Sequence, residues 1–106
     1  MFARLVTMQV RPHLMDEFPV TFEEEILPLL KQQRGFLDEL LLVTPEKREV
    51  AAISLWETQE HAEAYNRELY PRIGKILGKF TEGIPTVKQY DAEYSTFHKF
   101  ANAAKV

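Results

Sequence analysis

Hydrophobic residues fill nearly every position of the stretch from Val50 to Trp56. A strand with one solvated face would alternate apolar and polar residues, so this stretch predicts a central strand covered on both faces. Thr58 then suits the N-cap of a helix, and Glu60 suits the positive end of the helix dipole. Helical spacing continues at Ala62, Tyr65, Leu69 and Ile73. The segment therefore predicts a strand that leads directly into a helix.

Three other stretches predict strands. Residues 2–11 alternate in polarity, and the side chains that share the apolar face are Phe2, Val6, Met8 and Val10. Residues 36–43 are apolar on both faces, and the short polar turn at residues 44–48 predicts a hairpin into the central strand. Residues 86–94 form the most polar of the predicted strands, which suits an edge of the sheet.

The first predicted helix lies between residues 13 and 34, where apolar residues recur every three or four positions. Pro19 and Pro28 lie inside this pattern. Each proline lacks an N–H and crowds the preceding turn, so we expect a kinked or two-piece helix. Gly35 is expected to end it.

The second predicted helix starts at Thr58 and continues past Pro71, where we expect a break. Gly83 and Pro85 are predicted to end it. The whole domain is then expected to occupy residues 1–94. Residues 95–106 predict a C-terminal helical tail, which is too short to be stable alone in water and is expected to dock on the domain or on a partner subunit.

The predicted order is strand, helix, strand, strand, helix, strand, which is typical of an α+β protein with a ferredoxin-like fold. In that fold the first and third strands are central in a four-stranded antiparallel sheet, and both helices cover one face. The opposite face also appears apolar in the sequence, and we assign to it Leu37, Leu41, Val43, Ala51, Ile53 and Leu55. Such a surface is larger than a monomer usually exposes. We therefore predict a homodimer in which two sheets pack face to face into an α/β barrel.

The composition narrows the classes of function. The chain has 106 residues, 45% of them hydrophobic, which is enough for one domain with a core. The formal net charge is −3 and the basic residues are scattered, so neither nucleic acid nor an anionic membrane is an expected partner. There is no cysteine, which excludes disulfides and thiol chemistry. No signal peptide or long apolar run is visible, so we expect a cytoplasmic protein.

The segment SLWETQEHAEAY has a strand that ends in Trp-Glu and a helix that opens within two residues. Together with the element order, it resembles the antibiotic biosynthesis monooxygenase family of the dimeric α/β-barrel superfamily, over about residues 2–94. The resemblance implies a ligand pocket between the sheet and the two helices of each protomer. It also implies a cofactor-independent monooxygenase that acts on a small aromatic or quinol substrate, although the family includes haem-degrading enzymes and proteins without assigned activity.

The haem-degrading members carry an asparagine in the first strand, a tryptophan early in the second helix and a histidine about three turns later. In this chain the first strand has no asparagine, Tyr65 falls at the tryptophan position, and Lys75 falls near the histidine position. Because the axial ligand is missing, haem degradation is disfavoured. We expect no cofactor.

His61 and Tyr65 are the predicted catalytic residues. His61 lies in the first turn of the second helix, where the helix dipole disfavours its cation, so it is a candidate neutral base. Tyr65 lies on the inward stripe and could hold a substrate hydroxyl or act as an acid. The alternatives are a solvated histidine and a packing tyrosine. His61 and Glu63 point to different faces of the helix, so no metal site is predicted.

Other residues on these elements could contact a substrate. The predicted substrate-binding residues are Met8, Phe18, Phe22, Trp56, Asn66, Arg72 and Tyr90. The apolar and aromatic members would form walls, and Arg72 would hold an anion. Arg4 and Gln9 are further polar residues that could line the pocket. The alternative for each is ordinary core packing or a surface salt bridge.

Two functions remain open at this stage. The first is an oxygenase in which His61, or a water held by Tyr65, removes a proton from the substrate. The second is a non-catalytic homodimer that binds a small ligand or has a structural role. A void lined by His61, Tyr65 and Arg72 would favour the first, whereas a filled aliphatic space would favour the second.

Overall fold

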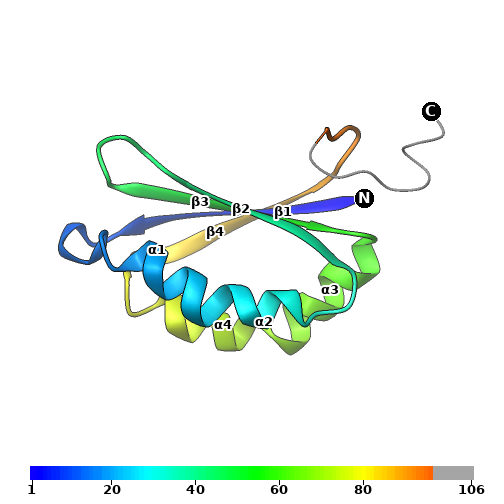
Figure 1. Cartoon of the computed structure of the whole chain (residues 1–106), viewed down its shortest axis with the longest axis horizontal. Helices are drawn as coiled ribbons and strands as arrows, with labels where there is room; N and C mark the ends of the chain where they lie inside the picture. Colours follow the sequence, from blue (N-terminus) through cyan, green and yellow to red (C-terminus); the bar gives the residue numbers. More distant parts are fainter. Residues whose placement is uncertain (97–106) are drawn as a thin grey trace.

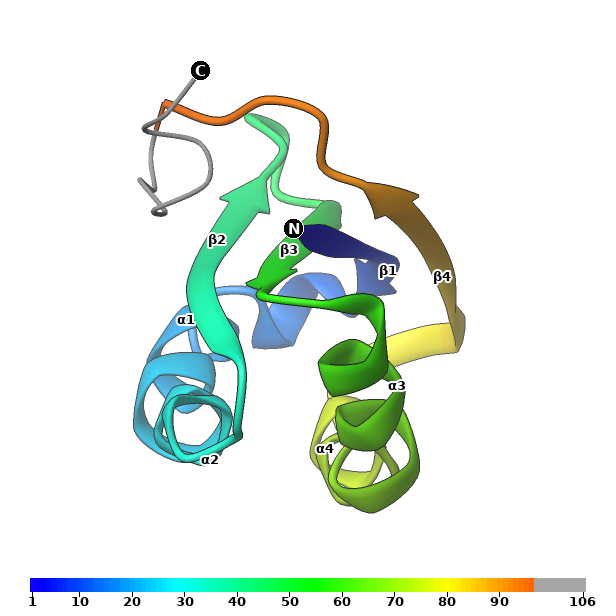
Figure 2. The same ribbon diagram turned by 90° about the vertical axis from the view of Figure 1, so that its right-hand side faces the viewer.

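The central strand β1 (Phe2–Val10) pairs antiparallel with β3 (Glu49–Trp56) on one side and with β4 (Thr81–Asp91) on the other. Strand β2 (Phe36–Val43) pairs with the outer side of β3, which gives the order β2-β3-β1-β4. The computed structural model describes residues 1–96, and within this range all helices lie on one face of the sheet (Figure 1). The end-on view shows the same two layers (Figure 2). The predicted ferredoxin-like fold is confirmed.

The hydrophobic core lies between the sheet and the helices. The predicted apolar face of β1 points into it, because Phe2, Val6, Met8 and Val10 are all buried. Trp56 lies opposite Phe2 at the end of β3 and is fully buried. The helical layer contributes Phe18, Phe22, Ile26, Leu30, Ala62, Tyr65, Leu69, Ile73 and Leu77.

The first helical region is broken into several short pieces, as its prolines predict. It consists of a 3-10 turn η1 (Pro12–Leu14), α1 (Phe18–Thr21), a π-helical turn η2 (Phe22–Ile26) and α2 (Leu27–Lys31). Pro19 lies in the first turn of α1, where no N–H donor is needed. Pro28 would crowd the carbonyl of Glu24 in a regular α-helix. The backbone is wider there, and the Leu27 N–H bonds to the carbonyl of Phe22, five residues back.

The second helical region begins and breaks where the sequence predicts. Thr58 caps α3 (Gln59–Glu68), since its Oγ1 accepts a hydrogen bond from the His61 N–H at 3.1 Å. A new helix, α4 (Tyr70–Leu77), starts at the predicted break with Pro71 in its first turn.

The prediction that Gly83 and Pro85 end this helix is wrong. α4 ends at Leu77, and β4 begins at Thr81, before the predicted start at residue 86. Gly83, at a φ of 75°, and Pro85 lie where the register between β1 and β4 is irregular. Because β4 is an edge strand, as predicted, it tolerates such an irregularity and a residue without an N–H.

The predicted facing of β2 is also wrong. A bulge between Phe36 and Asp38 shifts the register, and beyond it Leu41 lies opposite the buried Ala52. Leu41 and Val43 consequently pack against the core. The open face of the sheet instead carries Leu40, Leu42, Ala51, Ile53 and Leu55. Since β2 is apolar on both sides, its alternation alone could not decide which side faces the helices.

The predicted C-terminal helical tail, residues 95–106, lies outside the described residues except for its first two positions. Residues 92–95 have no regular secondary structure. Among residues 1–96, no helix has the length and apolar character needed to cross a membrane.

The two glycines Gly35 and Gly74 give a matched test of the backbone. Gly35 has a φ of 81°, and a Cβ there would meet the His61 ring. The left-handed conformation alone disfavours a side chain by roughly 1–2 kcal/mol, so Gly35→Ala is expected to destabilise the protein by at least that amount.

The control Gly74→Ala should raise the free energy of unfolding by about 0.5–1 kcal/mol, because a methyl group in this helix meets nothing within 4 Å. Urea unfolding at equal protein concentration measures both changes. A Gly35→Ala variant as stable as the wild type would contradict the left-handed turn.

Candidate functional site

Three polar residues form a row across the helix-covered face of the sheet. Arg4 on β1 lies opposite Ser54 on β3, and Ser54 lies opposite Glu39 on β2. Their neighbours on the same face are apolar, among them Val6 and Ala52. A polar row inside such a layer requires hydrogen-bond partners or a ligand, because unpaired buried polar groups are unfavourable.

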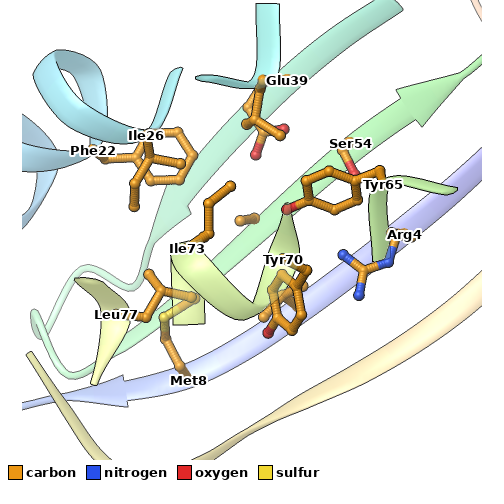
Figure 3. A pocket seen from close by; sticks show the side chains of 13 residues that line it. Arg4, Met8, Phe22, Ile26, Glu39, Ser54, Tyr65, Tyr70, Ile73 and Leu77 are labelled. Atoms are coloured by element: carbon orange, nitrogen blue, oxygen red, sulfur yellow. The ribbon is translucent and has the colours of Figure 1, made fainter. Parts of the chain in front are cut away.

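A cavity lies over this row, between the sheet and the helices (Figure 3). Its apolar lining consists of Val6, Met8 and Ala52 from the sheet, Phe22, Ile26 and Leu30 from the first helical region, and Ile73 and Leu77 from α4. Tyr65 and Tyr70 complete it, and the Glu39 carboxyl and the Tyr65 hydroxyl point into the same space. The cavity has a volume of about 30 Å³. That is room for roughly two water molecules.

Arg4 is held rigidly at one end of the row. Its side chain is only 2% exposed. One terminal nitrogen donates a hydrogen bond to Asn66 Oδ1 at 2.8 Å, and the guanidinium carbon lies 4.5 Å from the Tyr70 ring centre and 5.1 Å from that of Tyr65. The Nε atom has no hydrogen-bond partner among the described residues. Arg4 thus keeps a donor and a positive charge at the cavity.

Glu39 occupies the other end of the row and is the most perturbed acid of the site. The residue as a whole is partly accessible, but its Oε1 atom is buried and has no hydrogen-bond partner within residues 1–96. Burial raises the pKa of the Glu39 carboxyl to about 8, and the positive charge of Arg4 limits the rise. Near neutral pH this carboxyl can therefore both hold and release a proton.

The ring of Tyr65, which lines the cavity, packs against the ring of Trp56. The Trp56 ring stacks on that of Tyr65, with centres 4.7 Å apart and an angle of 30° between the planes. The indole Nε1 of Trp56 donates a hydrogen bond to Ser54 Oγ at 2.9 Å. Burial raises the pKa of the Tyr65 hydroxyl above its ordinary value. Tyr65 consequently stays protonated and can donate a hydrogen bond into the cavity.

The structure brings together only some of the predicted site residues. Met8, Phe22 and Tyr65 line the cavity. Trp56 and Asn66 do not line the cavity but contact residues that do. Trp56 stacks on Tyr65, and Asn66 accepts a hydrogen bond from Arg4.

The other predicted site residues lie away from this cavity. The ring of Phe18 packs against Phe80 in the core. The His61 Nδ1 lies 2.9 Å from Thr58 Oγ1 at the start of α3. Arg72 is exposed on α4, and Tyr90 is exposed on β4 opposite Ala3, on the open side of the sheet.

Glu39, Ser54 and Tyr70 were not predicted as site residues. A partial signal was present, since two adjacent acids, Asp38 and Glu39, interrupt an otherwise apolar strand. It does not show which of the two faces the helices. Arg4 was identified only as a polar residue that could line the pocket. Within residues 1–96, no cluster of three or more histidine, aspartate or glutamate side chains could hold a metal ion.

Comparisons with known proteins identify the family and the fold. The family described as antibiotic biosynthesis monooxygenase matches residues 1–70. A monooxygenase from the gene ActVA-Orf6 of Streptomyces coelicolor, solved in complex with nanaomycin D, has a TM-score of 0.73 at 15% identity, with 92% of each chain covered. No curated protein sequence matches the chain.

Two further solved structures have the same fold. A protein of unknown function from Nitrosomonas europaea has a TM-score of 0.75 at 12% identity, covering 93% of this chain and 95% of that one. A protein from Mycobacterium tuberculosis has a TM-score of 0.70 at 11% identity, covering 90% and 97%. At these identities the structural similarity shows the fold alone.

Glu39 should make the free energy of unfolding depend on pH. Its pKa is about 8 in the folded protein and near the ordinary 4.5 when unfolded, so between these values only the folded state keeps the proton. The contribution of this proton to the free energy of unfolding is fully present below about pH 4.5 and is lost as the pH rises through about 8. The free energy of unfolding falls by at most about 1.4 kcal/mol per pH unit in this range.

Glu39→Gln should remove this contribution, whereas Glu63→Gln, at an exposed position of α3, should keep it. Chemical denaturation from about pH 5 to about pH 9 compares the two variants with the wild type. Identical pH dependence in all three proteins would contradict a raised pKa for Glu39.

Proposed function

Because this chain belongs to the antibiotic biosynthesis monooxygenase family, we propose that it oxidises a small phenol or quinol in the cavity over Arg4, Ser54 and Glu39, without a cofactor. The observation that carries the proposal is the Glu39 carboxyl. It faces the cavity, has an unpartnered buried oxygen among the described residues, and has a pKa of about 8. A general base is most effective when its pKa lies near the working pH.

The proposed reaction begins when the Glu39 carboxylate takes the proton of the substrate hydroxyl. The resulting phenolate is electron-rich and reduces O₂ directly. For a phenol with an unsubstituted para carbon, one oxygen atom becomes the new carbonyl of a para-quinone. For a hydroquinone, whose para carbon already carries a hydroxyl, one oxygen atom becomes a hydroxyl on an unsubstituted ring carbon, and the product is a hydroxyquinone. In both cases the other oxygen atom leaves as water, with two of the hydrogens that the substrate releases from its hydroxyl groups and the oxidised ring carbon. The substrate supplies all four electrons, so no other reductant is needed.

Each residue of the site has a role in this scheme. The Arg4 guanidinium, fixed by Asn66, stabilises the phenolate that forms. Tyr65 donates a hydrogen bond to a substrate oxygen, which is the role that the sequence predicts for this residue. The sequence predicts His61, or a water held by Tyr65, as the base; we propose Glu39 for that role instead, because Glu39 lines the cavity and the His61 ring does not.

A non-catalytic, ligand-binding role is the second candidate, and the small cavity favours it. An apolar cavity of about 150 Å³ is known to bind benzene. The space here is about 30 Å³, so a ring can enter only if side chains move. The lining is not wholly aliphatic, however, and its polar row gives the oxygenase proposal the stronger support.

We also propose that the protein acts as a homodimer. Proteins of this family are generally dimeric. The open face of the sheet is apolar, and Leu40 and Leu42 on it are 39% and 46% exposed. Burying each large apolar side chain contributes roughly 1.5–3 kcal/mol. A second sheet packed against this face would cover these residues together with Ile53.

The activity predicts oxygen consumption with a panel of hydroquinones. The value of kcat/KM should rise with pH and level off above about pH 8, because Glu39 must be deprotonated to act as the base. Glu39→Gln should lower kcat by at least about 100-fold, while Glu63→Gln should not. An oxygen electrode measures the rates. Absence of oxygen uptake with every hydroquinone would overturn the oxygenase proposal.

The dimer predicts that Ile53→Asp, which puts a charge on the open face, will yield monomers. Val20→Asp, on α1 and 51% exposed, is the matched control and should leave the dimer intact. Analytical ultracentrifugation at micromolar concentration distinguishes the two states. A wild-type protein that sediments as a folded monomer would contradict the proposed assembly.

A further inference from the structure

A second hollow lies outside the cavity, at the surface between the first helical region and β2. It has a volume of about 340 Å³ and is lined by Pro19, Phe22, Glu23, Leu27, Glu39 and Leu41. We call it the outer groove. Phe22 and Glu39 line both the outer groove and the inner cavity. These two side chains therefore form the wall between the two spaces.

Phe22 is the aromatic side chain of this wall. It is the first residue of the π-helical turn η2, and its ring is 7% exposed. π-helical turns interrupt the regular hydrogen-bond ladder and occur often at functional sites. A change of the Phe22 rotamer would join the small cavity to the much larger groove without moving a strand.

The outer groove has a definite chemical character. Pro19, Leu27 and Leu41 give it apolar walls, and Glu23 is an exposed acid at its edge. Two further acids, Glu24 and Glu25, follow Glu23 in the sequence. Such a groove suits an uncharged apolar chain and disfavours a carboxylate.

Resting on the proposed function, we propose that the substrate is elongated: its hydroxylated ring lies against Glu39 in the widened inner cavity, and an uncharged apolar substituent passes Phe22 into the outer groove. Leu27 then determines specificity, because it contacts the substituent and not the ring. A single compact ring would leave the groove empty and gain nothing from it.

The test is titration calorimetry under nitrogen with hydroquinone and 2-alkylhydroquinones from methyl to hexyl. Affinity should rise roughly fourfold for each added methylene that becomes buried, until the groove is filled. A chain that ends in a carboxylate should bind more weakly than an alkyl chain of equal length. Phe22→Ala, which removes the wall, should bind the long homologues faster in stopped-flow measurements.

Leu27→Gln should reduce the gain in affinity per methylene, so the difference in affinity from the wild type should grow with chain length. Val20→Gln, at an exposed position of α1 outside the groove, is the matched control and should leave the whole series unchanged. Circular dichroism confirms that both variants are folded. The proposal of an elongated substrate is overturned if affinity does not rise with chain length, if the rise is as steep in Leu27→Gln as in the wild type, or if no homologue binds.

Binding without oxygen separates this inference from the oxygenase activity. If the long homologues bind as expected but consume no oxygen in air, the proposed function fails and the groove assignment stands. If hydroquinones are oxidised but the affinity does not depend on the chain, the groove assignment fails and the proposed function stands.

Discussion

The buried charge of Arg4 is the constraint on which the site depends. A guanidinium that is only 2% exposed would be strongly unfavourable without compensating partners. Asn66 supplies a hydrogen-bond acceptor, and Tyr65 and Tyr70 present their rings to the cation. These contacts join β1 to α3 and α4. The same interactions that stabilise the charge therefore fix the aromatic residues around the cavity.

The break between α3 and α4 makes this arrangement possible. Tyr65 and Tyr70 are five residues apart, so on one continuous α-helix their side chains would point about 140° apart. Both nevertheless lie over the guanidinium of Arg4. The chain departs from helical geometry at Leu69, where φ is −119°, and Pro71 starts the next helix. A proline that the sequence shows only as a helix breaker thus helps to position the tyrosines of the site.

The sequence predicts the fold better than the site, for physical reasons. Helical spacing, the Thr58 cap and the breaks at Pro19 and Pro71 are local signals, and the structure confirms them. The facing of β2 is not local, because a strand that is apolar on both sides shows no preference until its register is known. Glu39 was missed for the same reason. Its role depends on a partner strand, on burial and on Arg4, none of which its neighbours in sequence reveal.

The bulge in β2 decides which acid enters the site. Without the extra residue between Phe36 and Asp38, Asp38 would lie opposite Ser54, and Glu39 would turn to the open face. With it, Glu39 is one strand away from Ser54 and two from Arg4, roughly 10 Å between Cα atoms. Across that separation the Glu39 Oε1 atom has no hydrogen-bond partner among residues 1–96, but the carboxyl lies within the field of the guanidinium. Burial and the Arg4 charge then act in opposite directions, and the pKa of Glu39 settles at about 8, a value suited to proton transfer near neutral pH.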